Sequence, residues 1–267
     1  MQNEECRVKN DELRSDTSFI IRHSSFKAMI LAAGEGTRLR PLTLDCPKPM
    51  LPVAGRPLLE HTVEWLRRHG VSEIAVNLHY KPLSITGHFG DGSRFGVAIT
   101  YSHEEQLLGT AGAVKRLEHF FHGTFVVIYG DVLTDLDLTA MAAFHRDRGG
   151  AGSVALYRVD NPSARGLVET DGDGRILRFV EKPRPEEVFT DLANAGVYIL
   201  EPEILDHIPT ERRYDFGRDL FPDLLRRGVR LYGYPIPEAT RLIDIGIPES
   251  YQEAQGLFSP ERYRGSS

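Results

Sequence analysis

The sequence predicts an α/β fold in which a mostly parallel sheet is covered by helices on both faces. Short apolar runs that end in glycine or aspartate alternate with segments whose apolar residues have helical spacing, a pattern typical of parallel sheets. The length of 267 residues and the 41% share of apolar residues fit a globular domain of ordinary composition. A chain of this size buries roughly 70–75% of its unfolded surface, so the core needs no disulfides.

The first half of the chain alternates between strands and helices. A buried strand at 27–34, K-A-M-I-L-A-A-G, ends in glycine, and the strongest strand is F-V-V-I-Y at 125–129. Between these two strands the apolar pattern predicts five further elements. They are helices from Pro57 to about His69, near 82–89 and after Gly109, and strands at 73–78 and near 96–101.

The second half is richer in strands. Between 151 and 200 lie the strand-like segments S-V-A-L-Y-R-V, G-L-V-E-T, R-I-L-R-F-V-E and A-G-V-Y-I-L, and D-G-D-G at 171–174 indicates a hairpin. Helices are expected near 202–207, 216–227 and 248–256. Two short strands are expected between the last two helices, the second of them at 241–244.

The two ends of the chain are predicted to lie outside the folded domain, which spans 26–258. Residues 1–25 lack periodicity and are interpreted as a mobile extension or a vector-derived remnant, and residues 259–267 as a flexible tail. The first 26 residues hold no apolar stretch long enough for a secretory signal, and no window approaches 18 consecutive apolar residues. We therefore expect a cytoplasmic protein without a membrane partner.

The net charge and the number of cysteines argue against further classes of protein. The net charge of −6 argues against a nucleic-acid partner held by bulk electrostatics. Two cysteines, Cys6 and Cys46, are too few for a disulfide framework or a four-thiolate zinc site.

A glycine-rich loop follows the first strand, where an open α/β sheet binds its ligands. In L-A-A-G-E-G-T-R-L-R-P-L-T at 31–43, Gly34 and Gly36 leave backbone N–H groups free to point at phosphate oxygens. Thr37 and Arg38 follow, and an arginine fork suits phosphate. The loop lacks the G-K-[ST] of a Walker A motif and the third glycine of the dinucleotide fingerprint. A phosphate site of another kind is predicted, and a structural turn is the alternative.

Two aspartates are predicted at the carboxyl ends of strands, which form the functional rim of a parallel sheet. Asp131 follows the strand at 125–129, and Asp244 ends the strand at 241–244. Mg²⁺ prefers carboxylate and phosphate oxygens, so the pair could hold Mg²⁺ against a triphosphate. The alternative is that each aspartate only caps a helix.

Lys48 lies between two prolines, in P-K-P at 47–49. A rigidly presented lysine is suited to neutralise a phosphate during phosphoryl transfer, in which positioning and charge neutralisation do most of the catalysis. A solvated loop lysine is the alternative.

Together these motifs resemble the signature of the sugar-1-phosphate nucleotidyltransferases. The resemblance spans about 28–257 and implies a Rossmann-like mixed sheet, the nucleotide-diphospho-sugar transferase fold. It also implies a reaction in which an NTP and a sugar 1-phosphate give an NDP-sugar and pyrophosphate. The segments that carry it are G-E-G-T-R-L-R-P-L-T, P-K-P-M-L-P-V-A-G-R-P-L-L (47–59), L-G-T-A-G-A (108–113), Y-G-D (129–131), V-E-K-P (180–183), N-A-G-V-Y (194–198) and I-D-I-G (243–246).

The resemblance also implies roles for individual residues. Lys48 would neutralise the α-phosphate, Arg38 would hold the β- and γ-phosphates, and Lys182 would bind the phosphate of the sugar. The implied catalytic set is Arg38, Lys48, Asp131, Lys182 and Asp244, with Mg²⁺ on Asp131 and Asp244. The implied nucleotide-binding set is Ala33, Gly34, Gly36, Thr37, Glu104, Glu105, Gly109 and Thr110. The implied sugar-binding set is Gly166, Glu181, Lys182 and Asn194.

The segment Y-S-H-E-E-Q-L-L-G-T-A-G-A at 101–113 is most similar to mannose-1-phosphate guanylyltransferases. One carboxylate can accept both donors on the guanine edge, so Glu104 or Glu105 is expected to select GTP. The segment I-D-I-G-I-P-E-S-Y at 243–251 is equally similar to heptose-1-phosphate guanylyltransferases, which leaves D-glycero-D-manno-heptose 1-phosphate as an alternative to mannose 1-phosphate.

Two further interpretations of the function stay open. One is a thymidylyl- or uridylyltransferase that acts on glucose 1-phosphate, and the other is a catalytically silent sugar-nucleotide sensor. The expected partners are small-molecule substrates, an NTP and a sugar 1-phosphate, without nucleic acid, and a homodimer is the assembly to test.

Overall fold

One half of the central sheet consists of four parallel strands: β1 (Lys27–Leu31), β4 (Glu73–Leu78), β5 (Ala98–His103) and β6 (Phe125–Tyr129). β1 lies between β4 and β6, β5 pairs with β4, and each pair is parallel. The computed structural model describes residues 26–258, so the expectations for 1–25 and 259–267 lie outside the described residues. The predicted parallel strands are confirmed, with β5 two residues later than expected.

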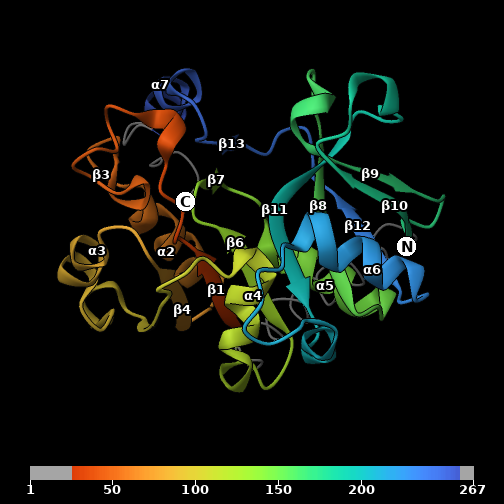
Figure 1. Cartoon of the computed structure of the whole chain (residues 1–267), viewed down its shortest axis with the longest axis horizontal. Helices are drawn as coiled ribbons and strands as arrows, with labels where there is room; N and C mark the ends of the chain where they lie inside the picture. Colours follow the sequence, from red (N-terminus) through yellow and green to blue (C-terminus); the bar gives the residue numbers. More distant parts are fainter. Residues whose placement is uncertain (1–25, 259–267) are drawn as a thin grey trace, which may run out of the picture.

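The other half of the sheet is built around the long strand β11 (Leu192–Leu200). β11 runs antiparallel to β6 on one side and to β8 (Gly152–Arg158) on the other, and β12 (Leu231–Pro235) pairs with β8 in parallel. Near its start β11 also meets β9 (Gly166–Thr170), which forms an antiparallel hairpin with β10 (Ile176–Glu181). These described strands form one mixed, nine-stranded sheet, and the hairpin is as predicted (Figure 1).

Helices cover both faces of this sheet, which confirms the predicted fold class. Side chains of β1 alternate between the faces, with Ala28 and Ile30 buried on one and Met29 on the other. The first face packs against α2 (Leu58–Arg68), α3 (Pro82–Phe89) and α5 (Leu138–Arg148). The opposite face packs against α4 (Gly109–Arg116) and α6 (Phe221–Arg226).

A two-stranded ribbon lies beyond the carboxyl end of β6 (Figure 1). β7 (Val132–Thr134) follows β6 closely and pairs antiparallel with β13 (Leu242–Asp244), so Asp244 lies opposite Val132. Helix α7 (Pro248–Leu257) packs beside this ribbon. The prediction that Asp244 ends a strand of the parallel sheet is therefore wrong. Pairing with β7 brings the aspartate to the same edge from outside that sheet.

Helix α5 is missing from the sequence-based expectation, although its start and stop signals are present. Asp137 caps the helix by accepting from the backbone N–H groups of Thr139 and Ala140, at 2.9 and 3.1 Å. Gly149 ends it in a left-handed conformation with φ of 60°.

Two of the predicted helices differ from an α-helix in their backbone hydrogen bonding. The segment expected near 202–207 is the 3-10 helix Pro202–His207. The segment expected at 216–227 begins as the π-helical turn Phe216–Leu220 before it continues as α6. The short strands β2 (Pro52–Val53) and β3 (Arg56–Pro57), which precede α2, are also additional to the expectation.

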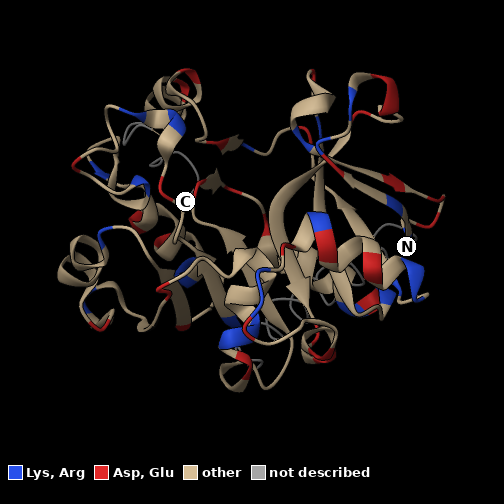
Figure 2. Ribbon diagram, viewed as in Figure 1, with Lys and Arg blue, Asp and Glu red and all other residues tan. Residues whose placement is uncertain are grey.

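Along the ribbon in Figure 2, positions of Lys and Arg are interspersed with positions of Asp and Glu. Within residues 26–258, no helix combines the length and the apolar character needed to cross a membrane.

Candidate active site

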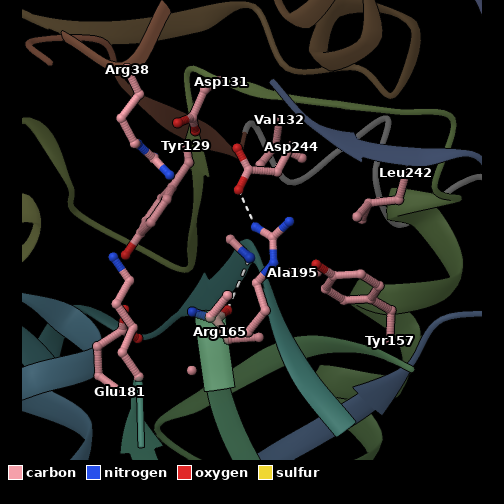
Figure 3. Close-up of a pocket in the computed structure, with 15 residues that line it drawn as sticks. Arg38, Tyr129, Asp131, Val132, Tyr157, Arg165, Glu181, Ala195, Leu242 and Asp244 are labelled. Carbon is pink, nitrogen blue, oxygen red and sulfur yellow. Dashed lines mark hydrogen bonds and ion pairs between the residues drawn. The ribbon is translucent and has the colours of Figure 1, made fainter. Parts of the chain in front are cut away.

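Two cavities lie next to each other beyond the carboxyl ends of β1 and β6, and Arg38 and Asp131 line both. The loop-side cavity, of about 230 Å³, is lined by the glycine-rich loop and Lys48. The hairpin-side cavity, of about 170 Å³, is lined by residues of β9, β10 and β11 and is drawn in Figure 3. Two ligands could therefore bind on opposite sides of the same two side chains.

The glycine-rich loop packs over the lysine segment. Gly36 has φ of 65°, a left-handed conformation that favours glycine, and a Cβ there would lie 3.0 Å from Lys48 Cβ. The Thr43 hydroxyl donates to the Gly36 carbonyl oxygen at 2.8 Å and fixes the turn. Gly34 and Thr37 are exposed and line the loop-side cavity, whereas Ala33 is buried.

A mostly buried ion pair joins the two motifs at the cavity. Lys48 is only 8% exposed, and its Nζ donates to Asp131 Oδ2 at 2.6 Å. Asp131 can lie here because Gly130 lets the end of β6 approach β1 closely. A Cβ at Gly130 would lie 2.8 Å from the carbonyl oxygen of Leu31.

Asp244 carries a second ion pair at the same edge. Arg165 Nη1 donates to Asp244 Oδ2, and Figure 3 shows the guanidinium pointing up to this carboxylate with Asp131 beside it. Burial, followed by the neighbouring Asp131 carboxylate, raises the pKa of Asp244 above its ordinary value. Arg165 and Lys48 act in the opposite direction. Arg165 is absent from the sequence-based set, although it directly precedes Gly166 in A-R-G-L-V.

The two aspartates fit a divalent cation. Asp244 Oδ1 is buried and has no hydrogen-bond partner among the described residues. An orphaned carboxylate oxygen beside a second carboxylate is the kind of donor set that Mg²⁺ prefers. No group of three or more His, Cys, Asp or Glu side chains that could hold a metal occurs within 26–258. Water molecules or oxygen atoms of a bound substrate would complete the ligand shell.

Glu181 lines the hairpin-side cavity and lies against two glycines, of which Gly166 also lines the cavity. A Cβ would lie 2.5 Å from Glu181 Oε2 at Gly166 and 2.7 Å from it at Gly217. Gly166 is the partner of Glu181 across the β9–β10 hairpin, and Gly217 belongs to the π-helical turn. Burial raises the pKa of Glu181, while Lys182 and Arg218 lower it. Gly217 is thus a further site residue that its sequence context does not reveal.

Lys182 lies next to Glu181 and lines the same cavity. Its φ of 51° is unusual for a residue with a side chain, and such backbone strain is found at functional sites. Its backbone N–H donates to the Arg165 carbonyl oxygen at 2.9 Å. The two cationic residues therefore lie opposite each other at the end of the hairpin.

Asn194 is oriented by a chain of polar groups. Its Nδ2 donates to the Tyr198 hydroxyl at 2.8 Å, and its Oδ1 accepts from the Gly196 N–H at 2.9 Å. Tyr198 is hydrogen bonded to Tyr129, and Tyr129 to Thr110. Burial raises the pKa of both tyrosines, so their hydroxyl groups stay protonated and available for these bonds. The chain links the hairpin-side cavity to the start of α4.

Glu104 is a buried support of the loops. It is 1% exposed, and its two carboxylate oxygens accept from Asn77 Nδ2 at 2.8 Å and from the Leu108 backbone N–H at 2.9 Å. Asn77 Oδ1 in turn accepts from the Ala32 N–H at 2.7 Å, at the start of the glycine-rich loop. Of the two candidates for a contact with the base, only Glu105 is exposed. The signal for Asn77 is a single amide within the apolar strand E-I-A-V-N-L.

Gly109 and Thr110 contact the segment before the π-helical turn. A Cβ at Gly109 would lie 2.6 Å from the Tyr214 carbonyl oxygen, so only glycine fits there. The Thr110 backbone N–H donates to Asp215 Oδ1 at 3.1 Å. Glu105, Gly109 and Thr110 are not among the residues that line the two cavities. Their expected part in nucleotide binding stays a prediction.

Two curated relatives cover most of this chain. It is 42% identical over 250 residues to a Synechocystis protein named UTP–glucose-1-phosphate uridylyltransferase, covering 88% of this chain and 64% of that protein. It is 40% identical over 226 residues to the Mycobacterium tuberculosis mannose-1-phosphate guanylyltransferase, covering 84% and 62%. The chain thus spans less than two thirds of the length of these relatives.

A solved structure and a family model agree with the relatives. HddC from Yersinia pseudotuberculosis, complexed with GMP-PN, is 30% identical and superposes with a TM-score of 0.74, covering 88% of this chain and 100% of that one. The nucleotidyl transferase family model matches residues 27–259. The fold, the paired cavities and this match agree with the expected family, and the chain belongs to the nucleotidyl transferase family.

Proposed function

We propose that this protein transfers a nucleotidyl group from an NTP to a sugar 1-phosphate and releases pyrophosphate. The observation that carries the proposal is the pair of cavities that share Arg38 and Asp131. Each cavity has its own cationic side chain, Lys48 on the loop side and Lys182 on the hairpin side. Two phosphorylated substrates would thus meet at the shared residues.

The reaction needs no nucleophile from the protein. A phosphate oxygen of the sugar substrate attacks the α-phosphorus of the NTP, the bond to the β-phosphate oxygen breaks, and pyrophosphate leaves with that electron pair. The barrier is lowered by positioning and charge neutralisation. Lys48 neutralises the α-phosphate, and Arg38 binds the β- and γ-phosphates with backbone N–H groups of Gly34 and Gly36.

Asp131 and Asp244 are the proposed ligands of Mg²⁺. A bound divalent cation would offset the negative charge of the triphosphate and of the departing pyrophosphate. The protein contributes the orphaned Oδ1 of Asp244 and the carboxylate of Asp131. Lys48 keeps the Asp131 carboxylate fixed at the boundary between the cavities.

The hairpin-side cavity is the proposed sugar site. Lys182 binds the phosphate, and Glu181 and Asn194 bond to sugar hydroxyl groups. The close fit of Gly166 and Gly217 against Glu181 supports a carboxylate held in one position. The hydrogen bonds of Asn194 to Tyr198 and Gly196 support a fixed amide in the same way.

The proposed substrates are GTP and mannose 1-phosphate. In support, the Mycobacterium tuberculosis relative is named a mannose-1-phosphate guanylyltransferase, and the solved HddC structure holds the guanine nucleotide GMP-PN. Glu105 is the proposed acceptor for the two donors on the guanine edge. The second candidate function, uridylyl transfer to glucose 1-phosphate, is favoured by the name of the Synechocystis relative. A cytoplasmic location belongs to the same proposal.

The test is pyrophosphate release from GTP, ATP, UTP, CTP and dTTP, each with mannose, glucose, heptose and N-acetylhexosamine 1-phosphates. We expect one NTP and one sugar 1-phosphate to give the highest kcat/KM, with GTP and mannose 1-phosphate as that pair. A silent sensor would give no pyrophosphate in any combination. Highest activity with UTP and glucose 1-phosphate would establish the second candidate.

A further inference from the structure

The two ion pairs of the site differ in how firmly their cations are held. The Lys48 side chain is 10% exposed and lies under Gly36. The Arg165 side chain is 36% exposed, and it lines both the hairpin-side cavity and an adjoining outer groove of about 490 Å³. The guanidinium of Arg165 therefore has open space on two sides of its bond to Asp244.

The backbone of Arg165 is fixed even though its side chain has room. Its N–H donates to the Pro162 carbonyl oxygen at 3.0 Å, and its carbonyl oxygen accepts from the Lys182 N–H at 2.9 Å. The next residue, Gly166, is paired with Glu181 in the hairpin. A rotamer change of Arg165 would thus move the guanidinium without moving the strands.

A divalent cation and Arg165 would compete for Asp244. The guanidinium already bonds to Oδ2, so a cation on this carboxylate would lie next to a positive charge. Like charges at such a distance repel, and the partial burial of the Asp244 carboxylate weakens the screening of this repulsion by water. Lys48 also lies beside the proposed cation, because it pairs with Asp131. Its side chain is only 10% exposed, against 36% for Arg165, so Arg165 is the cation that has room to leave.

We propose that Arg165 is the exchangeable counter-ion of Asp244: a divalent cation displaces its guanidinium, which then binds the phosphate of the sugar substrate beside Lys182. This inference rests on the proposed function. It assigns one residue to two successive partners, first the carboxylate and then the sugar phosphate.

The position of Lys182 supports the sugar phosphate as the second partner of Arg165. The backbone hydrogen bond between the two residues holds them opposite each other, and both line the hairpin-side cavity. A sugar phosphate carries up to two negative charges, and the planar arginine fork can bond to two of its oxygens at once. One lysine alone would leave part of that charge unpaired.

The first measurement is Mn²⁺ binding to the substrate-free protein, followed by electron paramagnetic resonance. Arg165→Gln removes the charge but keeps a hydrogen-bonding side chain, and we expect it to bind Mn²⁺ about tenfold more tightly than the wild type. Arg158→Ala is the matched control, since it removes a charge from the same groove. Arg158 pairs with the exposed Asp191, so Mn²⁺ binding should not change.

The second measurement is steady-state kinetics at saturating Mg²⁺. Arg165→Gln should raise KM for the sugar 1-phosphate about tenfold or more and leave KM for the NTP within about twofold. Arg165→Lys, which restores the charge without the fork, should recover part of that loss. Thermal unfolding checks that each variant is folded, and Arg165→Ala replaces Arg165→Gln if the latter is not.

Mn²⁺ affinity unchanged or weakened in the neutral variant overturns the proposal, and so does an unchanged KM for the sugar phosphate. The metal measurement uses no substrate. A failure of the proposed function, seen as no turnover by the wild type, is therefore distinguishable from a failure of this inference.

Discussion

Lys48 Nζ lies 2.6 Å from Asp131 Oδ2, so the loop after β1 and the end of β6 are joined by a charge pair between the two cavities. The pair is mostly buried, with side-chain exposures of 10% and 28%. Breaking such a pair leaves an uncompensated charge, which costs more than the pair itself contributes. We therefore expect the same contact to affect both stability and catalysis.

Asp131→Asn and Asp244→Asn should each lower turnover by at least about 100-fold, because they remove charge that would hold the metal without removing volume. Asp131→Asn should also lower the free energy of unfolding by about 1–3 kcal/mol, since Lys48 loses its counter-charge. Pyrophosphate release over a range of Mg²⁺ concentrations and chemical denaturation measure the two effects. Near-normal turnover of either variant at low Mg²⁺ would contradict a metal site on these aspartates.

Arg38→Ala and Lys182→Ala should separate the two substrates. Arg38→Ala should raise KM mainly for the NTP, and Lys182→Ala mainly for the sugar 1-phosphate, each by about tenfold or more. Initial rates with one substrate varied and the other saturating give both constants. If both variants raised KM for the NTP alone, the assignment of one cavity to each substrate would be wrong.

The two neighbouring glutamates should respond differently to replacement by glutamine. Glu105→Gln should flatten the preference for GTP over UTP and dTTP, because an amide cannot accept from both guanine donors. Glu104→Gln should instead lower thermal stability, because one of its two buried oxygens would become a donor facing Asn77 or the Leu108 N–H. Relative kcat/KM values and melting temperatures test the pair. A loss of base preference confined to Glu104→Gln would reverse these roles.

Gly217→Ala should impair use of the sugar substrate. The added Cβ would lie 2.7 Å from Glu181 Oε2 and push that carboxylate out of position, so KM for the sugar 1-phosphate should rise about tenfold. Gly172→Ala is the matched control, since a Cβ there meets no atom within 4 Å. Equal KM values for the two variants would show that the packing of Gly217 does not position Glu181.

Local sequence is enough to predict functional residues that stand in a recognisable local pattern. The apolar strand before Asp131 and the proline-flanked Lys48 are both visible in the printed order of residues. Their mutual contact is not, because 83 positions separate them and only the side-by-side pairing of β1 and β6 brings them together.

The remaining features depend on tertiary contacts that leave no local pattern. Arg165 meets Asp244 across 79 positions because β13 pairs with β7 and not with the parallel sheet. Glu104 and Glu105 differ in burial, which the sequence does not show because the two residues are chemically identical. Gly217 is significant only because the π-helical turn packs against Glu181.

The most direct test of the central claim is exchange of labelled pyrophosphate into the NTP. If the two substrates react directly at the junction of the cavities, the enzyme with Mg²⁺, NTP and labelled pyrophosphate should show no exchange. Exchange should begin only when the matching sugar 1-phosphate is added, because only then can the reaction run in both directions. Exchange without the sugar phosphate would reveal a nucleotidyl-enzyme and contradict direct transfer.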